Sequence, residues 1–207
     1  MKFIIVPFKN FKSAKTRMRK DLSTQETEKI VEKMLIHVLQ EVSKSQMSDE
    51  NFIITNDKKA ISIAAKFGIK IIEEEKQLSE SVSIDFASKI LKEKGATSVL
   101  RIPGDLPLLS FKDIDYIFKK AKEHNSCIVV PSKSGSGTNA MLRTPPDIIQ
   151  SFFGENSLQR HIKEFEDKKV QYRILENENI GLDIDCLNDL EHFRESHPNN
   201  SKHNPFS

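Results

Sequence analysis

The sequence predicts a single doubly wound α/β domain with one mainly parallel sheet. Short apolar runs alternate with amphipathic helical stretches along the chain, which is the order expected of successive strand–helix units. Hydrophobic residues make up 37% of the 207 residues and charged residues 30%, a balance that suits one folded domain with a packed core. No linker divides the chain, so we expect one domain over residues 1–194 and a polar, flexible tail over residues 195–207.

The first half of the chain alternates predicted strands with predicted helices. The first strand, residues 3–6, ends at Pro7, because proline lacks the backbone N–H that a strand ladder uses. Ser23 and Glu26 form a capping-box pattern that predicts the start of the first helix. The further predicted elements are that helix through residues 30–42, a strand over 52–54, a helix over 61–67 that ends at Gly68, a strand over 69–72 and a helix over 84–91 that ends near Gly95.

In the second half the alternation continues as far as Pro131 and then changes. Ser110, with Asp113 three residues later, predicts the start of another helix. The predicted elements are strands over residues 99–102 and 127–130, a polar loop over 132–137, a helix through 158–165, a strand over 170–175 and a helix over 186–193 with Asp185 as its candidate N-cap.

The composition excludes several classes of function. The 32 Lys and Arg residues nearly balance 30 Asp and Glu residues, so the net charge of +2 does not favour a nucleic-acid binder. The longest apolar run, residues 3–8, is too short for a membrane span or a signal peptide. Cys127 and Cys186 belong to no paired motif and predict neither a disulfide nor a zinc site. We expect a soluble cytoplasmic protein.

Four segments at the ends of predicted strands carry residues suited to chemistry, and ligands of open α/β sheets bind beyond the carboxyl ends of strands. The first is the basic loop over residues 7–18. The Lys and Arg side chains there can hold a polyphosphate, although a solvated basic loop explains the same pattern. The glycines and the GK[ST] ending of a P-loop are missing.

The second segment places Asp105 between Pro103 and Pro107, directly after a predicted buried strand. The prolines restrict the backbone around the carboxylate, which suits a metal ligand. A turn capped by Asp105 is the alternative interpretation.

The third segment, residues 135–140, combines two glycines with Thr138 and Asn139. Its backbone can approach a ligand closely, and its side chains add donors for an anion or a carboxylate. A plain turn is the alternative, since such clusters are common in turns.

The fourth segment contains Asp183 and Asp185. In an extended segment these two side chains share a face, opposite Leu182 and Ile184. Two acids on one face favour a cation between them, and with Asp105 they would form an oxygen-rich Mg²⁺ site. Taken together, a basic loop, an isolated aspartate and a late Asp-x-Asp indicate metal-assisted nucleotidyl transfer.

With these motifs in place, the sequence resembles the CofC-type guanylyltransferases of coenzyme F-420 biosynthesis. The similarity is collinear from Phe3 to about Phe193. It depends on Pro7, Lys9, Ala14, Lys15 and Arg17 (P-x-K…AKxRL), residues 103–109 (P-[AG]-D-[LV]-P-L), residues 137–140 (GTNA) and residues 183–185 (DID).

The resemblance implies a nucleotide-diphospho-sugar-transferase-like (Rossmann-like) nucleotidyltransferase fold, similar to that of the molybdopterin-guanylyl transferases. It also implies transfer of GMP from GTP to the phosphate of a small phosphorylated carboxylic acid, with Mg²⁺ as cofactor and release of pyrophosphate. The family's acceptors are 2-phospho-L-lactate, phosphoenolpyruvate and, in some members, 3-phospho-D-glycerate. The sequence leaves open the choice among them and the oligomeric state, for which a homodimer is one option.

The resemblance also implies roles for individual residues. Thr138, Gly154 and Ser157 would hold the acceptor's carboxylate, in part through backbone N–H groups, and the predicted helix start at Ser157 is suited to an anion. His161 on that helix is either a phosphate contact or a solvated surface residue. Further implied roles are catalysis for Lys15, Arg17 and Asp105, nucleotide binding for Lys9, Ala14, Lys15, Arg17, Ser79 and Asp105, and Mg²⁺ binding for Asp105, Asp183 and Asp185.

Two positions depart from the family pattern: Ser79 stands where asparagine is usual, which leaves the base specificity open, and Met18 stands where leucine is usual. The alternatives are another nucleotidyltransferase or a glycosyltransferase of the same fold, or a non-catalytic nucleotide-binding scaffold. A glycosyltransferase would place its Asp-x-Asp after the strand that here precedes Asp105, and a scaffold would be expected to lack one of the metal-binding acids.

Overall fold

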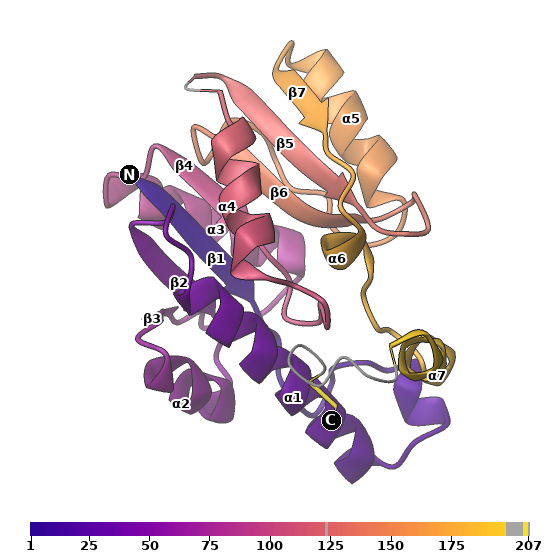
Figure 1. The fold of residues 1–207 in the computed structure, drawn as a ribbon. Helices are drawn as coiled ribbons and strands as arrows, with labels where there is room; N and C mark the ends of the chain where they lie inside the picture. The colour runs from indigo at the N-terminus through magenta and orange to yellow at the C-terminus, as the bar shows by residue number, and fades with distance from the viewer. Residues whose placement is uncertain (123, 198–204, 207) are drawn as a thin grey trace.

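The computed structural model describes residues 1–122, 124–197 and 205–206, which form one sheet with helices on both faces (Figure 1). The seven strands lie in the order β3-β2-β1-β4-β6-β5-β7. Only β6 runs antiparallel to its neighbours β4 and β5 among these strands, so the predicted mainly parallel α/β sheet is confirmed. The strands are β1 (Lys2–Pro7), β2 (Glu50–Ile54), β3 (Lys70–Ile72), β4 (Ser98–Arg101), β5 (Ser126–Pro131), β6 (Thr138–Thr144) and β7 (Gln171–Ile174).

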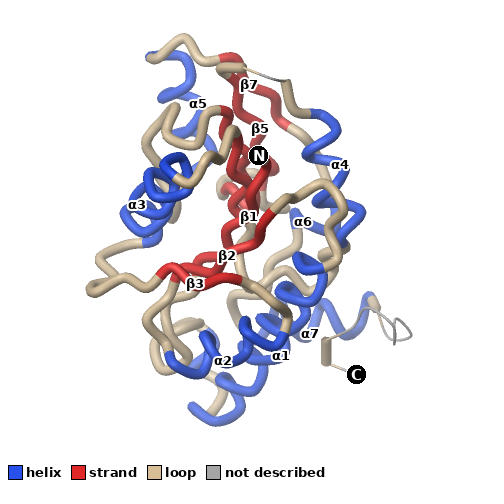
Figure 2. Tube along the Cα trace, turned by 90° about the vertical axis from the view of Figure 1, so that its left-hand side faces the viewer, coloured by secondary structure: helices blue, strands red, loops and turns tan. Residues whose placement is uncertain are grey.

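Helices cover both faces of the sheet, and Figure 2 shows α3 and α5 on one side and α4 and α6 on the other. In β1, Ile4 and Val6 pack toward α1, α2 and α4, while Phe3 and Ile5 pack toward α3. A strand buried on both faces requires a continuous apolar run, which the sequence supplies here. The helices are η1 (a 3₁₀ turn, Met18–Lys20), α1 (Thr24–Ser43), α2 (Lys58–Lys66), α3 (Glu80–Glu93), α4 (Phe111–Lys120), α5 (Ser157–Asp167), α6 (Glu178–Gly181) and α7 (Leu187–Ser196).

The local signals that predicted the starts of α1 and α4 and the end of α2 are confirmed. Ser23 and Glu26 cap α1 reciprocally, and Ser110 and Asp113 do the same for α4. Gly68 ends α2 in the left-handed region with φ of 69°, where glycine carries no steric penalty. These signals involve neighbouring residues, so they do not depend on the rest of the fold.

Strand β6 is absent from the sequence prediction, which assigned only a loop and a turn to this region. All seven of its residues are buried, and one of them is Arg143, whose side chain is 1% exposed. Arg143 donates to Asp85 Oδ1 at 2.8 Å, to Ser151 Oγ at 3.2 Å and to the carbonyl of Ile149 at 3.2 Å. Asp85 of α3 and the segment that follows β6 therefore supply partners for a buried cation that interrupts the apolar pattern of a strand.

The last helix begins one residue later than predicted. Cys186, and not Asp185, is the N-cap of α7, and Asp189 accepts from the N–H groups of both residues at 2.9 Å. The helix continues to Ser196, and Phe206 contacts the ring of Phe193 edge-on at 5.7 Å between centroids. The rest of the predicted flexible tail, residues 198–204 and 207, lies outside the described residues. Within the described residues, no helix is long and apolar enough to cross a membrane.

Candidate active site

The site lies where the carboxyl ends of β1 and β4 meet. These strands are parallel neighbours, with Ile5 paired to Arg101, so the loops that follow them leave the sheet at the same edge. The start of β6, the start of α5 and the segment between α6 and α7 close the other side of a cleft of about 920 Å³. An adjoining hollow of about 320 Å³ lies between the basic loop and Asp105. Segments far apart in the sequence therefore form one cleft.

Lys15 lines the smaller hollow and connects two carboxylates, Asp105 and Asp185, that line both the hollow and the cleft. Its Nζ lies 2.5 Å from Asp105 Oδ2 and 2.5 Å from Asp185 Oδ1, and its side chain is 9% exposed. Burial by itself would lower the pKa of Lys15, but the charges of Asp105 and Asp185 outweigh that effect and raise the pKa above its ordinary value. Lys15 therefore remains a cation between two acids that would otherwise repel each other.

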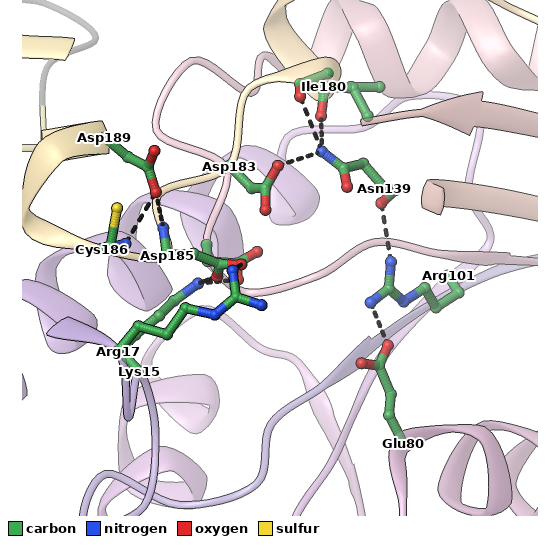
Figure 3. Close-up of polar contacts among 12 residues, drawn as sticks. Lys15, Arg17, Glu80, Arg101, Asn139, Ile180, Asp183, Asp185, Cys186 and Asp189 are labelled. Atoms are coloured by element: carbon green, nitrogen blue, oxygen red, sulfur yellow. Dashed lines mark hydrogen bonds and ion pairs between the residues drawn. The ribbon is translucent and has the colours of Figure 1, made fainter. Parts of the chain in front are cut away.

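The basic loop is held by its own side chains. Arg19 donates to the carbonyl of Ala14 at 2.9 Å and also to that of Phe11. This support keeps Lys15 in the left-handed region, with φ of 54°, where non-glycine residues are uncommon. Arg17 is largely exposed, and its Nη1 lies 4.0 Å from Asp185 Oδ2. Figure 3 shows Arg17 beside Lys15 and Asp185. The loop thus presents one buried cation and one free to reach a ligand.

Asp183 is positioned by a residue that the sequence interpretation had assigned to ligand contact. Asn139 Nδ2 donates to Asp183 Oδ1 at 3.0 Å and to the carbonyls of Ile180 and Gly181, so its donors are used within the protein (Figure 3). Burial, with the charge of Asp105, raises the pKa of the Asp183 carboxyl above its ordinary value. Asp183 therefore lies in the electrostatic field of Asp105, although the two are distant in sequence.

Asp105, Asp183 and Asp185 offer carboxylate oxygens to a cation, but they do not form a preassembled metal site. Asp105 Oδ1 is buried and has no hydrogen-bond partner among the described residues, and buried oxygens of this kind normally have one. Across the described parts of the chain, however, no three Asp, Glu, His or Cys side chains converge as a ready-made metal site. In this structure Lys15 contacts Asp105 and Asp185 instead.

Thr138 and Ser157 line the opposite wall of the cleft, together with Gly154. The N–H of Thr138 donates to Ser157 Oγ at 2.8 Å, so this N–H is occupied and is not the free donor that the sequence predicted. Gly154 has φ of 111°, and among the described residues no atom lies within 4 Å of an added Cβ, which leaves its backbone open on that side.

His161 is neither a phosphate contact nor a surface residue, so both interpretations were wrong. It is fully buried, and its Nε2 accepts from the N–H of Phe152 at 2.8 Å. The ring proton is consequently on Nδ1, which donates to Thr138 Oγ1 at 3.0 Å. Burial, with the nearby charges of Arg101 and Arg143, lowers the pKa of His161 to about 3. The Thr138 hydroxyl hydrogen is thereby left to donate elsewhere.

Arg101 is a site residue that the sequence interpretation missed. It donates to the carbonyls of Thr138 and Asn139 at 3.2 and 3.0 Å, ion-pairs with Glu80, and lies over the ring of Phe153 at 4.2 Å. It therefore ties the end of β4 to the start of β6. Its position two residues before the Pro103–Pro107 segment was the available signal.

The remaining predicted residues line two different hollows: the hollow beside Asp105 and a smaller pocket beside Phe8. Lys9, Ala14 and Arg17 line the hollow beside Asp105, and their role in nucleotide binding stays a prediction. Ser79 lines a third, smaller pocket beside Phe8, where its hydroxyl also accepts from the N–H of Val82 and begins α3. The structure thus brings the predicted residues to one edge of the sheet.

This arrangement is that of a nucleotidyltransferase fold. A structure from Desulfovibrio desulfuricans G20, assigned to the nucleotide-diphospho-sugar transferases, superposes on this chain with a TM-score of 0.78 at 13% sequence identity. The superposed region covers 97% of this chain and 89% of the other chain. At that identity the likeness concerns the fold alone.

The family follows from the sequence, which matches the family described as "Guanylyl transferase CofC like" over residues 1–203, so the chain belongs to it. A phosphoenolpyruvate guanylyltransferase of Conexibacter woesei is 29% identical over 93% of this chain and 87% of its own length. A 2-phospho-L-lactate guanylyltransferase of Methanobrevibacter smithii is 26% identical over 90% and 80%, respectively. The resemblance inferred from the motifs is confirmed.

Proposed function

We propose that this protein transfers GMP from GTP to the phosphate of a small phosphorylated carboxylic acid and releases pyrophosphate, as a step of coenzyme F-420 biosynthesis. The observation that carries the proposal is the meeting of Lys15, Asp105 and Asp185 at the carboxyl edge of β1 and β4. Family membership supplies the reaction class, and the relatives' names supply the candidate acceptors, 2-phospho-L-lactate and phosphoenolpyruvate.

The chemistry requires positioning more than proton transfer. A phosphate monoester has a second pKa of about 6, so its oxygen is already an anion at neutral pH. That oxygen attacks the α-phosphorus of GTP, a new P–O bond forms, and the bond to the β-phosphate oxygen breaks as pyrophosphate leaves. Lys15 and Arg17, which line the hollow beside Asp105, would hold the phosphates and stabilise their negative charge. The reaction therefore needs no protein base.

Asp105, Asp183 and Asp185 would hold Mg²⁺, as the unpartnered oxygen of Asp105 suggests. When bound, Mg²⁺ would neutralise phosphate charge during transfer. Asn139 and Asp189 would keep the Asp183 side chain and the Asp185 backbone in place.

The acceptor would lie against the wall formed by Thr138, Gly154 and Ser157. His161 directs the Thr138 hydroxyl, because its Nδ1–H already donates to Oγ1. The free hydroxyl hydrogen can then donate to the acceptor's carboxylate, a bond to a charged group that contributes roughly 1.5–3 kcal/mol. Carboxylate recognition is shared by all the candidate acceptors, so this wall selects the acid class.

The decisive experiment mixes the purified protein with GTP, Mg²⁺ and each candidate acceptor and follows pyrophosphate release. We expect release with at least one acceptor and loss of at least about 100-fold in kcat/KM in Lys15→Ala. Lys12→Ala is the matched control, because Lys12 belongs to the same loop but is exposed and lines neither hollow.

The alternatives predict other products. A glycosyltransferase would release a nucleoside diphosphate from a nucleotide sugar, and a scaffold would bind GTP without turnover. Either result would contradict the proposal.

A further inference from the structure

Three consecutive glutamates, Glu73, Glu74 and Glu75, follow strand β3, and only the middle one of the three is buried. Glu74 is 8% exposed, and its Oε2 accepts from Ser83 Oγ at 2.6 Å. Its Oε1 is buried and has no donor among the residues that the structure describes. A buried carboxylate oxygen without a donor is costly, so it indicates a missing partner.

Glu74 lines a pocket of about 210 Å³ on the nucleotide side of the site. Phe8 and Ile54 form apolar walls, and Gln77 Nε2 donates to the carbonyl of Phe8 at 2.9 Å. The volume is below the roughly 300–1,000 Å³ typical of drug-sized ligand pockets, so it suits a single planar base.

This pocket adjoins the hollow that contains Lys15 and Asp105. The two share Pro7, Phe8, Lys9 and Glu80 in their linings. A nucleotide with its phosphates at Lys15 would therefore place its base beside Glu74.

We propose that Glu74 recognises the guanine base, through its N1–H and 2-amino groups; this rests on the proposed use of GTP. An ionised carboxylate only accepts hydrogen bonds, so its partner must present donors. Guanine presents two adjacent donors on one edge, whereas hypoxanthine lacks the 2-amino group and adenine presents an acceptor at N1. A site built to bond a donor rejects the analogue that lacks it, because the buried acceptor is then left unpaired.

The test measures the dissociation constants of GTP and of inosine triphosphate for the same protein preparation by calorimetry. We expect the wild-type protein to bind GTP about 10- to 100-fold more tightly than inosine triphosphate, the effect of one bond to a charged group. In Glu74→Gln this ratio should fall close to 1, because an amide replaces one acceptor with a donor. The ratio cancels the active fraction, so partial misfolding of the variant does not obscure the result.

Glu75→Gln is the matched control: it removes the same charge from an exposed neighbour and should keep the wild-type ratio. Equal affinity of the wild-type protein for both nucleotides, no measurable binding of either, or an unchanged ratio in Glu74→Gln would overturn the assignment.

The pyrophosphate assay separates this inference from the proposed function. Turnover with GTP alongside an unchanged ratio in Glu74→Gln would overturn the role of Glu74 and leave guanylyl transfer standing. A ratio that depends on Glu74 without any turnover would support base recognition and overturn the proposed reaction.

Discussion

At the scale of single residues, the site depends on charges that balance one another in a buried setting. Lys15 lies between Asp105 and Asp185, and Asp183 is close enough to Asp105 for its pKa to rise. In such a cluster a neutral substitution changes the charge seen by every member. The residues should therefore respond to mutation as a unit.

Asp105→Asn should reduce kcat by at least about 100-fold, because it removes a charge from the site. The free energy of unfolding should change little, because the substitution nearly preserves shape and Lys15 keeps Asp185 as its counter-ion. Pyrophosphate release and denaturant unfolding measure the two quantities. Asp167→Asn, at an exposed position of α5, is the control and should leave both unchanged. Normal turnover in Asp105→Asn would remove this acid from the reaction.

His161 should make stability depend on pH. Its pKa is lowered to about 3 in the folded protein, whereas an unfolded histidine titrates near about 6.5. Between these two pH values the unfolded chain binds a proton at His161 that the folded protein does not bind. The contribution of His161 to the stability of the folded protein is therefore fully present above about pH 6.5 and is lost as the pH falls toward about 3. Within this pH range we expect the free energy of unfolding to fall by up to about 1.4 kcal/mol for each pH unit of acidification. Denaturant unfolding from pH 7 to 4 should show a shallower dependence for His161→Gln, and parallel curves for the two proteins would contradict this assignment.

At the scale of elements, β6 is held between β4 and β5 by its backbone hydrogen bonds to both strands and by the buried side chain of Arg143. Arg143 crosses to the α3 side of the sheet, where Asp85 accepts from it at 2.8 Å. Removing one member of a buried pair leaves its partner uncompensated. The strand that begins at Thr138 is therefore anchored near its far end by charge.

Arg143→Met should lower the free energy of unfolding by about 3 kcal/mol, because Asp85 then loses its cation. Lys92→Met is the control: Lys92 ion-pairs with Asp147 at 2.8 Å, but its side chain is 50% exposed, so the loss should stay below about 1 kcal/mol. Urea denaturation compares the two variants. Equal losses would show that burial of Arg143 is unimportant.

The turn between β5 and β6 offers a second test at this scale. A Cβ at Gly137 would lie 2.8 Å from Ser132 Oγ, which accepts from the N–H of Gly137 at 2.9 Å. Gly137→Ala should therefore displace the turn, cost about 1–3 kcal/mol and raise the acceptor KM. Gly135→Asn is the control, since its φ of 73° suits asparagine and an added Cβ meets no atom of the described chain within 4 Å. An acceptor KM that rises equally in both variants would contradict this explanation.

At the scale of the whole molecule, the site joins the two ends of the chain. Lys15 and Asp185 are 170 positions apart, and the nucleotide would lie between segments from both. A ligand that binds only the folded state stabilises the entire domain by mass action, by about 2.7 kcal/mol at 100 times its Kd. Binding should thus be visible in global unfolding.

GTP with Mg²⁺ at such saturation should raise Tm by about 5–11 °C, at roughly 2–4 °C per kcal/mol for a domain of this size. A chelator should remove the part of the shift that depends on the metal. In Asp105→Asn, GTP without metal and GTP with Mg²⁺ should give the same Tm. A shift unaffected by chelator in the wild-type protein would contradict metal binding at the three acids.

The sequence by itself determined the features that depend on local pattern. The apolar run of β1, the capping boxes of α1 and α4 and the glycine end of α2 each involve neighbouring residues. The motifs around Lys15, Asp105 and Asp183 also identified the family, because they are contiguous in sequence and collinear.

Only the tertiary structure decided which groups meet. It showed that Asn139 holds Asp183, that Lys15 lies between two acids and that Glu74 is buried while Glu73 and Glu75 are exposed. It also revealed β6, whose buried Arg143 is stabilised by partners from other elements. The physical reason is the same in each case: burial and charge pairing depend on residues distant in sequence, and no local pattern contains that information.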